Sequence, residues 1–232
     1  MSELSAIILC GGKGERLRPF TDTFPKPLVP LNGKPLLFYL LQHLRAGGVR
    51  HFVLCVGHKA DAIEDFARRS RSESWQMECV NSGDVSMADR ILHARQTVQG
   101  RAIICYGDTL ANVNLANLQS QHRSSEALAT LTVYPFHSPF GIVDMDEAGR
   151  VVSVREKPVL PYWINIGYML CEPQSFEFLS PGTDLPSFAA ALGRAGRLNS
   201  YRHQGKHVTV NTEKERSEAE VEMLEFFTVL EN

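Results

Sequence analysis

The sequence predicts an α/β fold: a layered, mostly parallel sheet with helices on both faces, into which an antiparallel hairpin is inserted. Short apolar runs alternate with longer amphipathic segments, which is typical of strand, crossover helix and parallel strand. After about residue 134 this alternation gives way to shorter runs around a glycine-containing turn. With 232 residues, 44% hydrophobic and 22% charged, the chain can bury a full core without a disulfide or a metal.

The strands of the parallel sheet are predicted at five runs rich in Ile, Val and Cys, and their continuous apolarity indicates burial on both faces. These runs are 6–10, 52–57, 76–80, 102–106 and 129–134. Helices that cover the sheet are predicted where apolar residues recur at helical spacing between the strands. These segments are 35–46, 59–69 and 87–96.

The second half predicts a hairpin and then a return to the sheet. Residues 141–144 and 151–155 flank a turn at Gly149, which is typical of an antiparallel pair. The further expected elements are a strand at 164–171, helices at 174–179 and 185–195, strands at 200–203 and 207–210, and a helix from Glu213. Because no low-complexity linker or internal repeat separates these parts, we expect one domain over residues 1–232.

The charge balance excludes some classes of partner. The chain has 24 Lys and Arg against 26 Asp and Glu, a formal charge of -2, and therefore lacks the basic footprint of nucleic-acid or anionic-membrane binding. Its apolar runs are shorter than the ~18 residues of a membrane span, and its first ten residues lack a secretory pattern. We therefore expect a cytoplasmic protein with neither nucleic acid nor membrane as a partner.

The five cysteines are scattered, without a Cys-x-x-Cys pair, and each lies in or beside an apolar run. A metal or redox set would require clustered thiolates. Buried free thiols are the favoured interpretation.

A glycine-rich segment follows the first strand. Gly11, Gly12 and Gly14 allow the backbone to approach an anion and direct N–H groups at it. Cations surround them at Lys13, Arg16, Arg18 and Lys26. Leu17 stands where the dinucleotide-binding fingerprint G-x-G-x-x-G requires its third glycine, so this fingerprint is excluded. A Walker A loop is excluded as well, because no Gly-Lys-Ser/Thr follows. The pattern predicts a polyphosphate site, although a glycine-rich turn with surface cations is the alternative.

The runs GGKGERLRPFT (11–21) and PKPLVP (25–30) resemble the signature of the sugar-1-phosphate nucleotidyltransferases. The resemblance extends over nearly the whole chain and implies a Rossmann-like sheet, with a nucleotide-binding half at 1–135 and a sugar-phosphate-binding half at 136–232. It also implies Mg²⁺ as cofactor and a nucleoside triphosphate and a sugar 1-phosphate as substrates. The nucleotide-binding residues that it implies are Cys10, Gly11, Gly12, Gly14, Arg16, Lys26 and Gly83.

Asp108 follows the strand at 102–106, at the carboxyl end where open α/β sheets bind ligands. The family resemblance implies that this carboxylate holds Mg²⁺, and that Asn211 stands where many members have a second aspartate. An amide oxygen is a neutral but competent ligand for a hard cation. The alternatives are that Asp108 caps a segment near Asn114 or is solvated, and that Asn211 caps the helix from Glu213. Arg16, Lys26 and Asp108 are the expected catalytic residues.

The run Glu156-Lys157-Pro158 resembles the family motif whose acid accepts hydrogen bonds from sugar hydroxyls and whose lysine binds the sugar phosphate. Gly141, Asn165 and Gly167 match further positions of sugar contact. An exposed charged turn is the alternative interpretation of the Glu-Lys-Pro run.

Residues 82–90 depart from the Gly-rich or Thr-Gly-Gly loop that members of the family have beside the nucleotide base. The sequence therefore does not determine which base the protein binds. The second half reads most like the glucose-1-phosphate cytidylyltransferases, and the start resembles the broader family, including guanylyl- and uridylyltransferases of heptose and amino-sugar phosphates. We expect an enzyme that uses CTP and a hexose 1-phosphate, with these GTP or UTP reactions as alternatives. The rivals are a non-catalytic regulatory module and an enzyme with a non-sugar phosphate or phosphonate acceptor. A homo-oligomer is also expected, since oligomers are common in the family.

Overall fold

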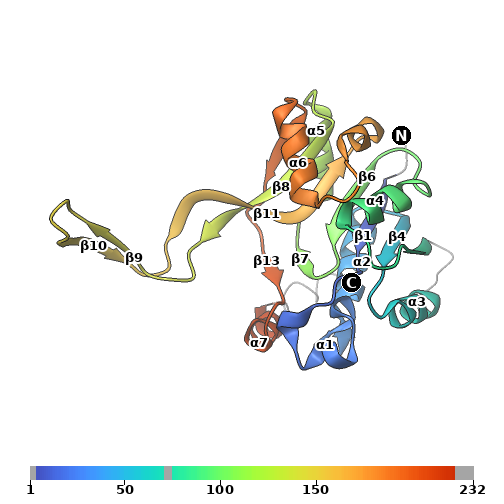
Figure 1. The fold of residues 1–232 in the computed structure, drawn as a ribbon, viewed down its shortest axis with the longest axis horizontal. Helices are drawn as coiled ribbons and strands as arrows, with labels where there is room; N and C mark the ends of the chain where they lie inside the picture. Colours follow the sequence, from blue (N-terminus) through green and yellow to red (C-terminus); the bar gives the residue numbers. More distant parts are fainter. Residues whose placement is uncertain (1–3, 71–74, 223–232) are drawn as a thin grey trace.

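The computed structural model describes residues 4–70 and 75–222. At its centre lies a seven-stranded sheet in the order β12-β8-β11-β6-β1-β4-β5 (Figure 1). The strands are β1 (Ser5–Leu9), β4 (His51–Val56), β5 (Gln76–Asn81), β6 (Ala102–Tyr106), β8 (Ala129–His137), β11 (Val159–Cys171) and β12 (Leu198–Arg202). All neighbouring pairs are parallel except those that β11 makes with β6 and β8. The predicted mostly parallel sheet is confirmed.

Helices cover both faces of this sheet because successive side chains of each central strand point to opposite sides. Ala6 and Ile8 of β1 join the apolar cluster beneath α2 (Leu36–Ala46), α3 (Ala60–Arg69) and α5 (Leu115–Arg123). Ile7 joins the cluster beneath α4 (Met87–Arg95) and α6 (Leu185–Arg194). The alternation buries β1 on both sides, as its continuous apolarity predicts.

Three of these helices begin at residues whose side chains accept a hydrogen bond from the first turn. Ser86 Oγ accepts from the Asp89 N–H (3.1 Å), Asn114 Oδ1 from the Asn117 N–H (2.9 Å) and Asp184 from the Ser187 N–H (2.8 Å). Such caps satisfy backbone donors that have no partner within the helix. The cap at Ser86 fixes where α4 begins, and α4 forms one wall of the pocket described below.

The structure differs from the sequence-based expectations in several elements. The helix expected at 174–179 is a 3₁₀ helix, η3 (Pro173–Phe178), so the α-helical assignment was wrong. Burial on both faces is wrong for β5, which is an edge strand and consists of exposed and half-buried residues. The sequence also missed α5 and the short strand β7 (Thr109–Ala111), which pairs with β13 (His207–Thr209).

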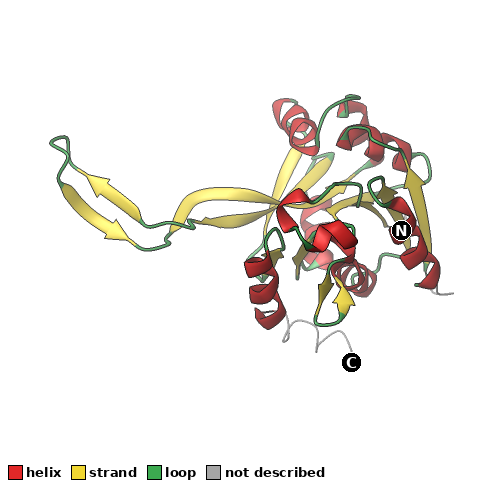
Figure 2. Ribbon diagram, turned by 60° about the horizontal axis from the view of Figure 1, so that its bottom comes forward, coloured by secondary structure: helices red, strands yellow, loops and turns green. Residues whose placement is uncertain are grey.

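The remaining short helices and strands lie in the segments that connect or follow the strands of the central sheet. They are η1 (Glu15–Leu17), α1 (Phe20–Thr23), η2 (Lys26–Leu28), β2 (Pro30–Leu31), β3 (Lys34–Pro35), β9 (Ile142–Met145), β10 (Val151–Arg155) and α7 (Glu213–Glu222). The antiparallel hairpin β9–β10 confirms the predicted insertion, with Gly149 at φ 80° in its turn. It stands away from the sheet, at the end of an arm that β8 and β11 begin (Figures 1 and 2).

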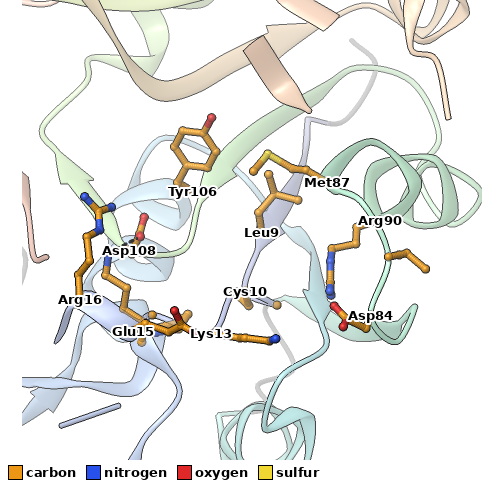
Figure 3. A pocket seen from close by; sticks show the side chains of 16 residues that line it. Leu9, Cys10, Lys13, Glu15, Arg16, Asp84, Met87, Arg90, Tyr106 and Asp108 are labelled. Carbon is orange, nitrogen blue, oxygen red and sulfur yellow. Dashed lines mark hydrogen bonds and ion pairs between the residues drawn. The ribbon is translucent and has the colours of Figure 1, made fainter. Parts of the chain in front are cut away.

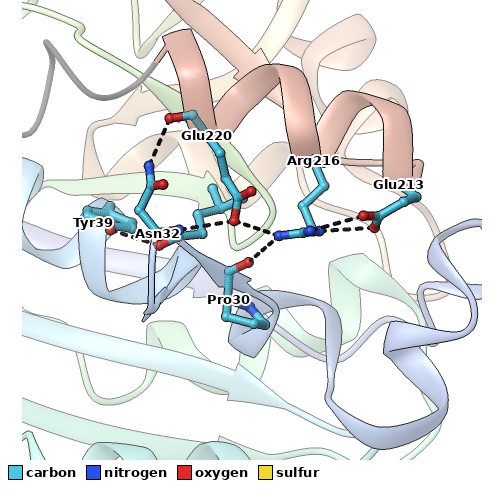
Figure 4. Close-up of polar contacts among 7 residues, drawn as sticks. Pro30, Asn32, Tyr39, Glu213, Arg216 and Glu220 are labelled. Atoms are coloured by element: carbon cyan, nitrogen blue, oxygen red, sulfur yellow. Dashed lines mark hydrogen bonds and ion pairs between the residues drawn. The ribbon is translucent and has the colours of Figure 1, made fainter.

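Helix α7 is docked onto the β2–β3 turn by a polar cluster (Figure 4). Arg216 donates to Glu213 (2.9 Å), to Glu220 (2.6 Å) and to the carbonyl of Pro30 (3.4 Å). Glu220 in turn accepts from the backbone N–H of Asn32 (3.1 Å). These bonds join segments far apart in sequence. They hold α7 in place, and with it the residues just before the helix, including Asn211.

The cysteines are free, and four of them are buried while Cys79 is half-buried. Burial raises the pKa of the Cys55 thiol to about 12 and that of Cys79 to about 11. The prediction of buried free thiols is confirmed apart from the partial exposure of Cys79. Within the described ranges, no helix has the length and apolarity to cross a membrane.

Acidification from pH 7 to pH 5 is expected to lower the free energy of unfolding by about 2 kcal/mol through His43 of α2. Burial lowers the pKa of His43 from 6.5 to about 4, opposed by a hydrogen bond to the Val113 backbone and assisted by His203. Because the folded-state pKa is depressed, the unfolded chain binds the proton first. The contribution is therefore complete above pH 6.5 and is lost as the pH falls toward 4.

Urea unfolding of the wild type and of His43→Gln at both pH values checks this expectation. The variant should lose less stability than the wild type between pH 7 and pH 5. An equal loss in both proteins would show that His43 does not carry the pH dependence.

Candidate active site

A pocket of about 640 Å³ opens at the carboxyl ends of β1 and β6 (Figure 3). These strands are neighbours in the sheet, and the Gly107 N–H donates to the carbonyl of Leu9 (3.0 Å), so the loops that follow them start side by side. The pocket is lined by Leu9, Cys10, Gly11, Gly12, Lys13, Gly14, Glu15, Arg16, Lys26, Pro27, Asp84, Val85, Met87, Arg90, Tyr106 and Asp108. All predicted nucleotide-binding and catalytic residues except Gly83 are therefore pocket-lining.

Four predicted residues from distant parts of the chain form a polar cluster at this pocket. The Lys26 ammonium donates to Asp108 Oδ2 (2.6 Å) and to Asn211 Oδ1 (2.9 Å). The same Asn211 oxygen accepts from the Arg16 guanidinium (3.2 Å). Lys26 is only 8% exposed, whereas the Asp108 side chain is 35% exposed and Arg16 is open to solvent. We call Arg16, Lys26, Asp108 and Asn211 the cation cluster.

The contacts of the cation cluster exclude the capping and solvated alternatives for Asp108 and Asn211. Asp108 is paired with Lys26, and it neither caps a helix, since Asn114 caps α5, nor stands free in solvent. Asn211 directs its side chain to the two cations, and Thr212 Oγ1 accepts the Glu215 N–H at the start of α7. The capping interpretation of Asn211 was wrong.

Gly14 of the glycine loop packs so closely against Lys26 and Thr21 that a side chain at this position has no space. A Cβ atom on Gly14 would lie 3.0 Å from the Cβ of Lys26 and 3.0 Å from Cγ2 of Thr21, and Gly14 has φ 65°. Thr21 Oγ1 donates to the Gly14 carbonyl (3.0 Å), which ties the loop to α1. Glycine is the residue that tolerates both this backbone conformation and this crowding.

Arg90 of α4 lies across the pocket from the cation cluster, and it belongs to none of the predicted sequence motifs (Figure 3). Its guanidinium donates to the carbonyls of Val56 (2.7 Å) and Gly83 (2.8 Å), and the residue is 7% exposed. A Cβ atom on Gly11 would lie 2.0 Å from its Nη1, and one on Gly57 would lie 2.2 Å from the same atom. Within the described part of the chain, Arg90 forms no ion pair with a carboxylate.

Arg90 changes the interpretation of two predicted nucleotide residues. The absent side chain of Gly11 makes space for the guanidinium, and the carbonyl of Gly83 accepts from it. The signal in the sequence was an arginine inside an apolar helical stripe, three residues after Met87 and one before Ile91. Tyr106 and Met87 are further pocket residues that motif reasoning missed, because apolar and aromatic walls carry no motif.

The predicted sugar-binding residues fall into two groups. Asn165 Oδ1 accepts from the Gly167 N–H (2.8 Å), and a Cβ on Gly167 would lie 2.0 Å from the ring of Tyr106, a pocket residue. These two residues therefore lie at the edge of the pocket. The other group is Gly141, Glu156 and Lys157, which are exposed on the arm and do not line the pocket.

On the arm, Gly141 and the Glu156-Lys157 run lie together at the base of the hairpin. A Cβ atom on Gly141 would lie 3.1 Å from the Glu156 carboxylate, so the glycine leaves that side of Glu156 open. Lys157 has φ 43°, which is uncommon for a residue other than glycine. The exposed turn that was the alternative for this run is observed, and a role in sugar binding stays a prediction.

The pocket can neutralise a polyanion and offers no activated nucleophile. Lys13, Arg16, Lys26 and Arg90 bring cations to its walls. Its one thiol, Cys10, is buried, and burial raises the pKa of this thiol far above neutrality, which keeps it protonated and unreactive. Chemistry here must therefore depend on positioning and on charge stabilisation.

The oxygen donors of Asp108 and Asn211 fit a hard cation. Both already lie within hydrogen-bond distance of one positive group, the Lys26 ammonium, so they converge on a position suited to positive charge. Carboxylate and amide oxygens are ligands that Mg²⁺ accepts, and it usually takes further ligands from water and substrate phosphates. Within the described ranges, no group of three or more His, Cys, Asp and Glu residues could hold a metal by itself.

Comparisons with known proteins agree with this geometry. Residues 5–193 match the model of the family described as nucleotidyl transferase. The chain is 30% identical to a Bacillus subtilis protein named probable glucose-1-phosphate cytidylyltransferase, over 91% of this chain and 92% of that one. It is 29% identical to the D-glycero-alpha-D-manno-heptose 1-phosphate guanylyltransferase of Campylobacter jejuni, over 66% and 69% of the two chains.

Solved structures with a similar fold include another nucleotidyltransferase of this kind. The UTP-bound UGPase of Acinetobacter baumannii superposes with a TM-score of 0.77 at 18% identity, over 99% of each chain. The predicted fold is therefore confirmed, including its type. By its sequence match over most of its length, the chain belongs to the nucleotidyl transferase family of sugar-1-phosphate nucleotidyltransferases.

Proposed function

We propose that the protein transfers a nucleotidyl group from a nucleoside triphosphate to a sugar 1-phosphate and releases pyrophosphate. The cation cluster is the observation that carries this proposal. It places two cations, a carboxylate and an amide oxygen at the end of the glycine loop, in a pocket large enough for a nucleotide. Such a set is suited to bringing two polyanions together and stabilising charge on phosphate oxygens.

In the proposed reaction an oxygen of the sugar phosphate attacks the α-phosphorus, and the bond from that phosphorus to the β-phosphate bridging oxygen breaks. A phosphate dianion is already nucleophilic, which agrees with the absence of an activated side-chain nucleophile from the pocket wall. Lys26 would move its ammonium contacts to the α-phosphate, and exposed Arg16 would neutralise the leaving pyrophosphate. The loop amides of Gly12 and Gly14 would donate to the phosphates.

Mg²⁺ is proposed as the cofactor, held by Asp108 and Asn211 together with substrate phosphates. When bound, it supplies positive charge to the phosphate oxygens. The support for this assignment is the convergence of the two side chains on one cationic group. A single carboxylate in the set leaves more of the coordination to the nucleotide than a pair would.

The acceptor is proposed to lie between the pocket and the base of the arm. Gly167 packs on Tyr106 at the edge of the pocket, and Asn165 lies beside it. Glu156 could accept hydrogen bonds from sugar hydroxyls and Lys157 could bind the sugar phosphate, with Gly141 leaving the Glu156 carboxylate accessible.

CTP with a hexose 1-phosphate is the proposed substrate pair. A relative that matches along nearly its full length is named for cytidylyl transfer. GTP or UTP with a heptose or amino-sugar 1-phosphate is the second candidate, since the Campylobacter relative is named for guanylyl transfer. The site of reaction is proposed to be the cytoplasm, where the product would supply polysaccharide synthesis; five free cysteines are typical of a reducing compartment.

Pyrophosphate release tests the function directly. The protein is incubated with Mg²⁺, with CTP, UTP, GTP, ATP or dTTP in turn, and with pooled hexose, heptose and amino-sugar 1-phosphates. Release with one nucleotide that requires both Mg²⁺ and an acceptor is the expected result, and it names the base. Silence in every combination, from folded protein that binds nucleotide, would favour the regulatory module or a non-sugar acceptor.

Replacing Asn211 by leucine is expected to lower kcat/KM by about tenfold or more, because Arg16 and Lys26 lose their shared acceptor. Asn211→Asp keeps the acceptor and adds a carboxylate. It should retain activity and reach half-maximal rate at a lower Mg²⁺ concentration. Titration of Mg²⁺ in steady-state assays of both variants measures this difference, and an unchanged Mg²⁺ requirement in Asn211→Asp would remove Asn211 from the metal site.

A further inference from the structure

An exposed guanidinium is stacked on an aromatic ring near the base of the arm. The guanidinium of Arg202, at the end of β12, lies 5.0 Å from the ring centroid of Trp163 in β11. Arg202 is exposed and Trp163 is 44% exposed, so the contact is open to solvent. Within the described ranges, Arg202 forms no hydrogen bond and no ion pair. The ring therefore holds the guanidinium in place without neutralising its charge.

The strand register places Arg202 on the face of the sheet that the pocket uses. Arg202 pairs with Val133 of β8, and Val133 pairs with Asn165 of β11, so these three side chains form one row across three strands. Leu131, two residues before Val133, packs against the apolar cluster of α4 and α6, and so does Tyr106 of the pocket wall. The row therefore lies on the same side of the sheet as Tyr106.

The row continues the edge of the sheet at which the pocket opens. β12, β8 and β6 run in the same direction, because β11 is antiparallel to both β8 and β6. Arg202 and Tyr106 are the last residues of β12 and β6, and three strand spacings, about 14 Å in total, separate them. Since β8 lies between β12 and β11, the contact of Arg202 with Trp163 spans β8 and links this end of the row to the strand beside β6.

We propose that Arg202 binds a negatively charged substituent of the acceptor, at the end of the sugar opposite its 1-phosphate. This inference deepens the proposed function and rests on it: the 1-phosphate must meet the nucleotide in the pocket, and Arg202 lies at the far end of the space proposed for the acceptor. The other side chains of the row, Val133 and Asn165, are neutral, so the guanidinium is the group there that selects a charge.

The chemistry of a guanidinium defines the class of acceptor. Its planar fork of N–H groups binds a carboxylate or a phosphate through two parallel hydrogen bonds. The acceptor is therefore a sugar 1-phosphate that carries a second anionic group, either the carboxylate of a hexuronate or a second phosphate.

Trp163 orients the guanidinium before the acceptor binds. A long arginine side chain normally loses rotamer freedom when it binds a ligand, and a fixed position reduces this cost. Removal of the ring should therefore weaken binding of the anionic group even though the charge of Arg202 remains.

Binding of matched acceptors to the full chain tests the proposal without requiring turnover. Isothermal titration calorimetry, with Mg²⁺ and a mixture of the α,β-methylene analogues of CTP, GTP and UTP, compares glucose 1-phosphate with glucuronate 1-phosphate and with glucose 1,6-bisphosphate. Galactose 1-phosphate and galacturonate 1-phosphate form a second comparison. At least one anionic acceptor is expected to bind about tenfold or more tightly than its neutral counterpart. The larger gain, from the carboxylate or from the second phosphate, identifies the group that Arg202 binds.

Variants of the Arg202–Trp163 contact show whether this preference depends on it. Arg202→Met should abolish the preference and leave the affinity for the neutral acceptor unchanged. Arg202→Lys should keep part of the preference, because the charge remains but the fork is lost, and Trp163→Leu should lose most of it. The matched control is Arg194→Met, which removes an exposed arginine at the end of α6 and should keep the full preference.

Equal affinities for the neutral and anionic acceptors in both comparisons would overturn the proposal, and so would an Arg202→Met protein that keeps the preference. Failure of the proposed function gives a different result. A protein that prefers the anionic acceptor but releases no pyrophosphate with any substrate pair would retain this binding site and lose the proposed activity.

Discussion

Asparagine in place of Asp108 is expected to lower kcat/KM by about 100- to 1,000-fold while the fold persists. The substitution keeps the size of the side chain and removes its charge. The Lys26 ammonium would then lose the carboxylate that it contacts at 2.6 Å, and the proposed metal would lose its one charged protein ligand. Steady-state pyrophosphate release, measured at several Mg²⁺ concentrations, gives the size of the loss and shows whether added metal restores part of it.

The matched control is Asp22→Asn, which removes a carboxylate close in sequence to the glycine loop. Asp22 is 58% exposed and pairs with Arg18, also exposed, so its loss should leave the rate close to that of the wild type. Thermal unfolding of both variants should stay within a few degrees of the wild type. An Asp108→Asn enzyme within tenfold of wild-type activity would exclude this carboxylate from the mechanism.

Methionine in place of Arg90 is expected to lower the free energy of unfolding by about 3 kcal/mol. Methionine fills part of the space but donates no hydrogen bond. The carbonyls of Val56 and Gly83 would then lose donors at 2.7 and 2.8 Å, in a region where Arg90 itself is 7% exposed. Urea unfolding measures the loss, with Arg123→Met, an exposed arginine at the end of α5, as the control.

Nucleotide binding should weaken in the same Arg90→Met protein at temperatures where it remains folded. Arg90 joins the end of β4 to the loop at Gly83, and the next two residues of that loop line the pocket. Arg90→Lys, which restores one charge-assisted donor, should recover part of both losses. Wild-type stability and affinity in Arg90→Met would show that neither carbonyl depends on this guanidinium.

Much of the fold could be predicted because its central strands are continuous apolar runs that have only one stable location, between two layers of helices. The strand predicted at 102–106 and the helix predicted at 87–96 are examples in which local sequence and tertiary structure agree. The two failures have different physical reasons. The segment at 173–178 is short, and local pattern does not separate a 3₁₀ turn from the start of a helix. β5 is an edge strand, and edge position is a property of the whole sheet.

The sequence by itself determined the family, the parallel sheet, the glycine loop and the residues of the cation cluster, because motifs and apolar periodicity are local in the chain. Only the tertiary structure decided that Asn211, 185 residues beyond Lys26, contacts it, and that Arg90 packs on Gly11. It also decided that the Glu156-Lys157 run lies on an arm with exposed apolar side chains. Such contacts depend on how the strands are ordered and how the helices pack, and local pattern does not encode them.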